Sequence, residues 1–173
     1  DEIIDLRGKD EDGVLEWDTP RGNWQIIEYV CIPDEDNDRP DILSYEASEQ
    51  FLNTAYEPFA DLLEPYMGKT VTHFYFHDLA FDSRNRHDWT ESFNEVFAKR
   101  FGFDPAPYYP YLFVRSGNYT DHYKTMFSDC RARMLRDGFL LAAERFAEKQ
   151  GLVLFGGIAE PKLTECPPVT GDA

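Results

Sequence analysis

The sequence predicts an α/β fold in which two buried strands run parallel in one sheet. Short runs of β-branched and aromatic residues at 71–76 and 152–155 have the composition of buried strands. Long stretches of helical periodicity separate the two runs, and a strand that returns through such a crossover pairs in parallel. The chain has 173 residues, of which 42% are hydrophobic and 16% aromatic, enough to bury one substantial core.

The first 33 residues are predicted to form β structure. Apolar runs occur at residues 3–6, 14–17 and 24–32, and the turn dipeptide Asp12-Gly13 separates the first two. A second turn is expected at residues 19–23. We therefore divide the chain into an N-terminal β segment, residues 1–33, and an α/β domain, residues 34–173.

Helical periodicity begins after Ser44, which is a suitable N-cap. Apolar residues recur at three- and four-residue steps from Phe51 to Tyr66, which indicates one apolar helical face. Gly68 is expected to stop the helix. Pro58 should kink it or start a second helix, because proline removes a helical hydrogen bond.

Two further helices are expected before the second buried strand. Residues 88–91, Asp-Trp-Thr-Glu, have the spacing of a capping box with Asp as the N-cap. The helix that this box opens should end at Gly102. A longer helix is predicted from about Thr120 to Gln150, with Gly151 ending it.

Acidic residues follow both predicted strands. Ligands bind at the carboxyl ends of strands in parallel α/β folds, and these ends lead into Asp78 and Glu160. Hydrolysis of a glycosidic bond needs two carboxyl groups: one protonates the leaving oxygen, and the other activates water or attacks the sugar carbon. We predict Asp78 and Glu160 as the catalytic pair. The alternative is that Asp78 caps a turn and Glu160 is a solvated loop residue.

Three other residues are predicted to contact a substrate. His77 is a candidate polar contact, and Trp89 and Tyr108 are candidates for stacking on a sugar face, with burial in the core as the alternative for both rings. His73 lies four strand residues before His77, about 13 Å away, so the two do not form one metal site. The acidic run 34–38 resembles a calcium loop but lacks its glycine and distal glutamate, which favours a solvated loop. No metal is predicted, and no cofactor is predicted either, since the chain has no glycine-rich nucleotide-binding motif.

Charge and cysteine content exclude several classes of function. Asp and Glu number 33 against 17 Lys and Arg, a formal charge of -16, which would repel nucleic acid and anionic membrane surfaces. No apolar run approaches the ~20 residues of a membrane span. Cys31, Cys130 and Cys166 are too far apart for a disulfide scaffold or a zinc site, and we expect them to be buried thiols.

Residues 15–24 carry the most specific motif, Leu-Glu-Trp-Asp-Thr-Pro-Arg-Gly-Asn-Trp. The motif resembles the Leu-x-Trp-x-x-Pro-x-Gly-x-Trp hairpin of α-L-rhamnosidase-like glycoside hydrolases, family 106 and its relatives. In that family the hairpin leads into a catalytic barrel. Further similar segments follow in the same order along the chain, namely residues 43–47, 97–104, 107–110, 151–152 and 170–173.

The resemblance implies a partial (β/α)8 TIM-barrel-like domain preceded by a β-hairpin segment. At 173 residues the chain falls short of the about 250 that a closed barrel takes, so we expect a piece of a longer protein. The implied activity is hydrolysis of glycosidic bonds in rhamnose-containing or related polysaccharide, at a secreted or periplasmic location. The calcium dependence of the family falls on no matched residue of this chain. Glu160 matches an acidic position of the family.

The chain also departs from the family pattern. Leu79 and Ala80 follow Asp78 where a second acidic residue is often found, and only Asp41 represents the acidic residue before the first helix. The alternative function is therefore a non-catalytic or degenerate barrel module that binds glycan or packs against other domains. Because an incomplete barrel leaves strand edges open, we also expect either self-association or poor solubility, unless the charge of -16 offsets them.

Overall fold

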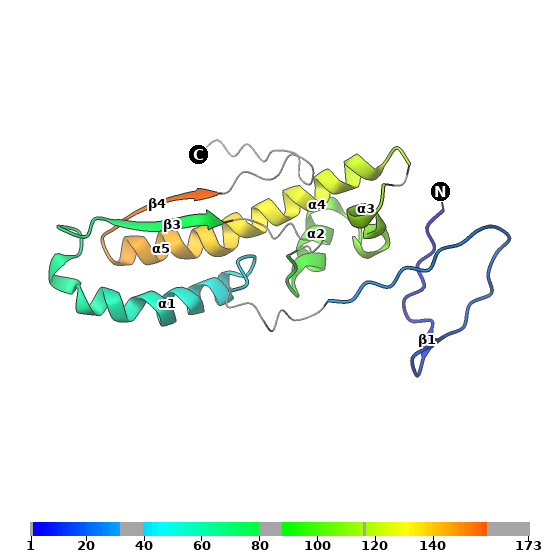
Figure 1. Ribbon diagram of the computed structural model, residues 1–173, viewed down its shortest axis with the longest axis horizontal. Helices are drawn as coiled ribbons and strands as arrows, with labels where there is room; N and C mark the ends of the chain where they lie inside the picture. Colours follow the sequence, from blue (N-terminus) through cyan, green and yellow to red (C-terminus); the bar gives the residue numbers. More distant parts are fainter. Residues whose placement is uncertain (1, 32–39, 80–87, 116, 159–173) are drawn as a thin grey trace.

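A computed structural model of the protein describes residues 2–31, 40–79, 88–115 and 117–158, and combines helices with a small open sheet (Figure 1). Strands β3 (His73–Leu79) and β4 (Val153–Ile158) pair in parallel. This pairing confirms the predicted β-helix-β unit. The helices are α1 (Tyr45–Leu62), α2 (Phe93–Phe101), α3 (Pro110–Phe113), α4 (Thr120–Leu135) and α5 (Leu141–Lys149), with 3₁₀ turns η1 (Glu64–Tyr66) and η2 (Ala106–Tyr108).

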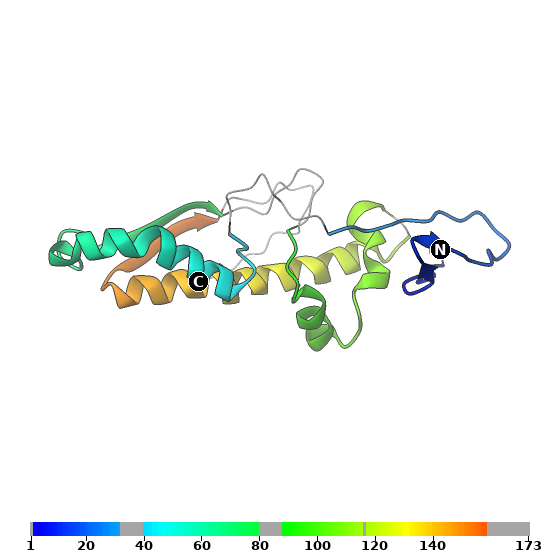
Figure 2. The ribbon, with the colours of Figure 1, turned by 90° about the horizontal axis from the view of Figure 1, so that it is seen from below.

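One long helical run forms the spine of the molecule. α4 continues through a π-helical turn, η3 (Arg136–Leu140), into α5, and together they follow the long axis (Figure 2). This run confirms the helix predicted at about 120–150. Gly151, with φ of 68°, follows its end, and the chain then turns back into β4.

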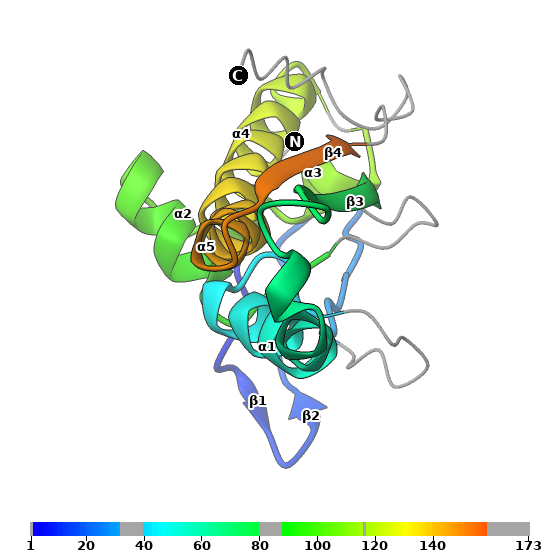
Figure 3. The same cartoon turned by 90° about the vertical axis from the view of Figure 1, so that its left-hand side faces the viewer.

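The strands and α1 pack around the α5 half of the spine (Figure 3). The ring of Phe74 on β3 lies 5.1 Å from that of Tyr56 on α1 and 5.3 Å from that of Phe146 on α5. Strand alternation sends Phe74 and Phe76 toward this core and leaves Tyr75 and His77 exposed on the other face. The sheet therefore has one helix-covered face and one outward face.

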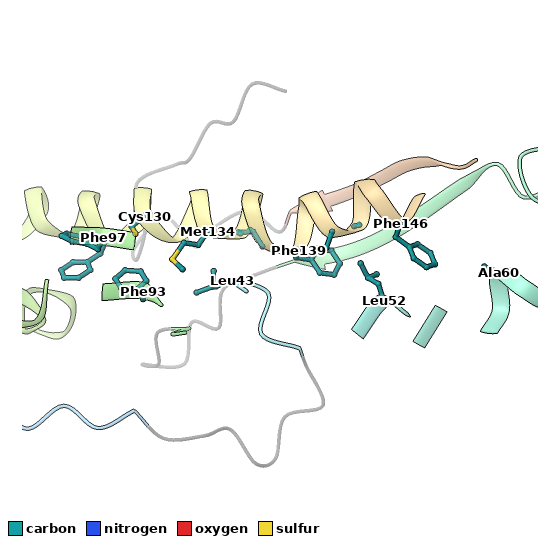
Figure 4. Close-up of a cluster of buried hydrophobic side chains, with 13 residues drawn as sticks. Leu43, Leu52, Ala60, Phe93, Phe97, Cys130, Met134, Phe139 and Phe146 are labelled. Carbon is teal, nitrogen blue, oxygen red and sulfur yellow. The ribbon is translucent and has the colours of Figure 1, made fainter. Parts of the chain in front are cut away.

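A second group of aromatic residues surrounds the α4 half. Phe93 and Phe97 of α2 are fully buried and stack near Phe127 of α4, with ring centroids 6.2 and 5.1 Å from it. Figure 4 shows that the buried side chains form a continuous row along the spine, from Phe97 at one end to Ala60 at the other. The two groups thus make one elongated core.

The segment before α1 crosses the spine at Gly138, within the π turn. The amide of Phe139 donates a hydrogen bond to the carbonyl of Ile42, with an N···O distance of 3.1 Å. A Cβ atom at position 138 would lie only 2.7 Å from that carbonyl oxygen and 3.0 Å from the carbonyl of Leu43. Only glycine allows this approach without displacing the backbone.

A second glycine permits close packing inside the sheet. The ring of Phe76 lies over Gly156, its register partner on β4, so a Cβ at 156 would be 2.5 Å from the Phe76 ring. The Phe76 ring also packs against the ring of Phe139 in a T-shaped arrangement, with 5.9 Å between the centroids. Phe76 therefore connects the strand pair to the π turn of the spine.

The N-terminal segment differs from the prediction. β1 (Asp10–Glu11) and β2 (Val14–Leu15) form a short antiparallel hairpin around the predicted turn at Asp12 and Gly13, whose φ angles of 52° and 78° suit a tight hairpin turn. Residues 3–6 and 24–31 are not strands. Their β-branched residues have no partner strand within the described chain, and β-propensity reflects such packing rather than backbone preference alone.

Contacts of single side chains hold this segment to the rest of the chain. Arg7 forms an ion pair of 2.6 Å with Asp104, and the ring of Tyr29 packs on those of Tyr109 and Phe113. Within the family-like motif, the indole N–H of Trp24 donates to the carbonyl of Pro20 at 2.9 Å. The motif therefore begins with Leu15 at the end of β2 and continues outside any strand as a local turn. The division at residue 33 stays a prediction.

The helix boundaries confirm some predicted signals and correct others. Ser44 is the N-cap of α1 and accepts from the Ala47 amide, and Gly102 ends α2 with φ of 84°. α1 continues through Pro58 as one helix, so no second helix starts there. α2 begins at Phe93, not at the predicted capping box of residues 88–91. The described residues contain a two-stranded parallel sheet, and the TIM barrel stays a proposal.

Replacing Gly138 by alanine should destabilise the protein, which is the opposite of the usual effect in a helix. Alanine normally stabilises a helix interior by about 1 kcal/mol over glycine. Here the added methyl group meets the Ile42 carbonyl, and overpacking of this kind costs about 1–3 kcal/mol. Urea denaturation of Gly138→Ala should show a lower midpoint, whereas a raised midpoint would contradict the close approach.

Two adjacent glycines of β4 should respond differently to alanine. Gly156→Ala places a methyl group in the Phe76 ring and should lower the free energy of unfolding by about 1–3 kcal/mol. At Gly157 a Cβ would meet nothing within 4 Å, so Gly157→Ala is the matched control and should leave stability nearly unchanged. Equal effects in thermal unfolding would show that Phe76 does not pack on Gly156.

Candidate functional site

A bulge lies at the carboxyl end of β3. The register joins Phe76 to Gly156 and resumes at Leu79 with Ile158. Between these pairs β3 has His77 and Asp78, where β4 has one residue. Bulges of this kind redirect side chains and are common beside active sites. The irregular register thus falls on the two residues of β3 that the sequence singles out.

The predicted carboxylates follow two paired strands. Since β3 and β4 are parallel, their carboxyl ends share one edge of the sheet, and Asp78 belongs to β3 at that edge. Glu160 lies outside the described residues, beyond Ile158, the last residue of β4. The pairing of the strands is the part of the predicted site that the structure tests and confirms.

His77 belongs to a short row of rings on the outward face of the sheet. Its Nδ1 lies 2.9 Å from the hydroxyl of Tyr75, and the two rings stack at 6.0 Å between centroids. Tyr75 stacks in turn on Phe155 of β4, at 5.5 Å. Neither Tyr75 nor Phe155 is among the site residues predicted from the sequence. The two-residue period of a strand, which places residues 75 and 77 on one face, is the signal that could have found Tyr75.

Trp89 and Tyr108 lie in the aromatic groups around α2, α3 and α4. The ring of Trp89 is 4.1 Å from that of Phe93, and Tyr108 stacks on Tyr123 at 4.4 Å. Both residues are half-buried. Their contacts match the alternative of core packing, and their role in binding substrate stays a prediction.

Burial raises the pKa values of two side chains in and beside these aromatic groups, Tyr109 and Cys130. Burial raises the pKa of Tyr109 to about 12, and the Tyr109 hydroxyl donates a hydrogen bond to the side-chain oxygen of Asn94. Burial also raises the pKa of the Cys130 thiol to about 11, as expected of a buried cysteine. Cys31 is exposed, so its predicted burial is wrong, and Cys166 lies outside the described residues.

The described part of the chain shows no group of three or more His, Cys, Asp or Glu residues that could hold a metal ion. The acidic run 34–38 is not among the described residues. Among those that are, no helix is long and apolar enough to cross a membrane.

A shallow groove of about 330 Å³ separates α1 from α5. Its cationic side chains have partners: Arg145 donates to the Tyr45 hydroxyl at 3.0 Å, and Lys149 forms an ion pair of 2.6 Å with Glu57. The groove is lined by Tyr45, Glu49, Leu52, Asn53, Ala142, Arg145, Phe146 and Lys149. None of the predicted site residues belongs to it.

Comparison with known proteins relates the chain to a family of enzymes. The model of the α-L-rhamnosidases, glycoside hydrolase family 106, matches residues 1–165. A protein of Formosa agariphila named "Putative beta-glucuronidase" is 24% identical over 165 residues, which cover 87% of this chain but 14% of that protein. No solved structure matches the chain. The match over nearly its whole length shows that this chain belongs to glycoside hydrolase family 106.

Proposed function

We propose that the chain forms part of the active centre of an enzyme that hydrolyses glycosidic bonds of rhamnose-containing or related polysaccharide. Membership of the family supports a carbohydrate-active hydrolase. One structural observation carries the finer proposal: β3 and β4 are paired in parallel, and the bulge at His77 and Asp78 lies at their common carboxyl edge. That edge is where parallel α/β enzymes place their catalytic residues.

The proposed reaction uses Asp78 and Glu160 as the two carboxyl groups. Neighbouring strands lie about 4.8 Å apart, and carboxyl groups that follow adjacent strands can meet the separations used by glycosidases, about 5–5.5 Å for retention and 6.5–9.5 Å for inversion. One group protonates the leaving oxygen, and the other attacks the sugar or activates water. His77 contacts the sugar beside them, and Trp89 and Tyr108 stay candidates for stacking on it.

The whole enzyme requires more than the described residues. The chain corresponds to 14% of the Formosa protein, so we propose that further strands of the full-length protein complete a barrel around this unit. The predicted self-association belongs to the same proposal. Each strand of the two-stranded sheet has one edge without a partner strand among the described residues, and added strands or a second copy would pair with these edges. A secreted or periplasmic location is also proposed.

Removing either carboxyl group from the full-length protein should abolish most of its activity. Glu160→Gln and Asp78→Asn should each lower the rate of hydrolysis of an aryl α-L-rhamnoside by about 10²–10⁴, the usual contribution of general acid–base catalysis. The exposed helical carboxylates Glu95 and Asp61 provide matched controls, because Glu95→Gln and Asp61→Asn make the same chemical changes away from the strand edge.

The comparison among these variants separates the alternatives. An unchanged rate for Glu160→Gln would show that the site assignment is wrong even though the family is right. A full-length protein that folds and binds glycan but hydrolyses neither an aryl α-L-rhamnoside nor an aryl β-D-glucuronide would instead support the non-catalytic module. The second substrate is included because of the name of the Formosa protein.

A further inference from the structure

The outward face of the sheet joins three rings from two strands. Phe155 of β4 supports Tyr75 of β3 with an interplanar angle of 27°, and Tyr75 supports His77 at 29°. Both centroid separations, 5.5 and 6.0 Å, fall in the range of favourable aromatic stacking. A ring held from one side in this way has fewer accessible orientations than a histidine projecting alone from a strand.

Tyr75 also makes a polar contact with His77. Its hydroxyl lies 2.9 Å from Nδ1 of the imidazole, a normal hydrogen-bond distance. The partner of one ring nitrogen determines which nitrogen carries the proton. If the phenol donates to Nδ1, the neutral imidazole carries its proton on Nε2 and presents Nε2–H as a hydrogen-bond donor.

We propose that Tyr75 is a positioning residue that fixes the orientation and the Nε2–H tautomer of His77, making His77 a donor to an oxygen of the bound sugar. The proposal rests on the proposed function, because it assigns His77 a ligand at the same strand edge. Phe155 contributes by holding the Tyr75 ring, so both strands of the sheet take part in orienting one side chain. A sugar offers hydroxyl, ring and glycosidic oxygens as acceptors for this donor.

The neighbouring His73 provides an internal comparison. Its Nδ1 lies 2.8 Å from the Thr72 hydroxyl, so both histidines of β3 have a hydroxyl group at Nδ1. Thr72 directly precedes His73 in the sequence, at the amino end of β3, whereas His77 lies near its carboxyl end. Thr72→Val therefore removes a comparable hydroxyl without changing the surroundings of His77.

Nitrogen NMR of the ¹⁵N-histidine-labelled chain tests the proposal directly, at a pH where the imidazoles are neutral. His77→Gln assigns the His77 signals. In the unmodified chain, Nε2 of His77 should be protonated and its Nδ1 resonance displaced by the hydrogen bond it accepts. Tyr75→Phe keeps the ring and should abolish that displacement of the His77 Nδ1 resonance, with the His73 resonances unchanged. Thr72→Val should move the His73 Nδ1 resonance and leave the His77 resonances unchanged.

Two results would overturn the proposal: a proton on Nδ1 of His77 in the unmodified chain, or a His77 spectrum that does not respond to Tyr75→Phe. Thermal unfolding provides the check on folding, since Tyr75→Phe removes only an exposed hydroxyl and should leave the melting temperature nearly unchanged. If the melting temperature falls and the His73 and His77 signals both move, Tyr75 supports the strand in general and the positioning role is wrong.

A double-mutant cycle in the full-length protein measures the functional consequence. Tyr75→Phe should lower kcat/KM by about two- to tenfold, the usual value of one hydrogen bond, and should have no effect in a His77→Gln background. Equal losses in both backgrounds would contradict positioning. The full-length protein could show the expected His77 resonances and their response to Tyr75→Phe but have no glycosidase activity. That result would count against the proposed function and would leave the Tyr75–His77 interaction established.

Discussion

The contact between Gly138 and the segment before α1 is the constraint on which the rest of the structure depends. It occurs at the buried residues of the π turn, Gly138 and Phe139, where the missing side chain lets the Ile42 carbonyl reach the Phe139 amide. The π turn provides the irregular backbone for this contact, since such turns depart from the regular helical hydrogen-bond pattern. The contact fixes where α1 starts, and the N-cap at Ser44 follows two residues after Ile42.

The position of the strand edge follows from the same turn. Phe139 meets the ring of Phe76, and Phe76 covers Gly156, so a chain of contacts leads from the spine through β3 to β4. The bulge at His77 and Asp78 begins immediately after this anchored pair. Two glycines thus support the proposed site: Gly138 permits the crossing of the segment before α1, and Gly156 accommodates the Phe76 ring beside the bulge.

The sequence predicted those parts of the fold that depend on periodicity and on caps. The parallel strands, the long helix, the Ser44 cap and the Gly102 stop all carry local signals, and the structure confirms them. The N-terminal strands failed because β-branched residues need a partner, which the described residues do not supply. The π turn at Arg136–Leu140 packs on the segment before α1, which is distant in sequence, so apolar periodicity could not reveal it. The strand period places Tyr75 and His77 on one face but does not show that their side chains are hydrogen-bonded.

We expect the contact at Gly138 to unite α1, α5 and the strand pair into one cooperative unit beneath the proposed site. Native-state hydrogen exchange of the backbone amides measures this cooperativity directly. The amide of Phe139 and the paired amides of β3 and β4 should exchange with the same opening free energy, equal to that of the α5 amides. Strand amides that exchange freely while the α5 and Phe139 amides stay protected would contradict this cooperativity, because the sheet would then open independently of the spine.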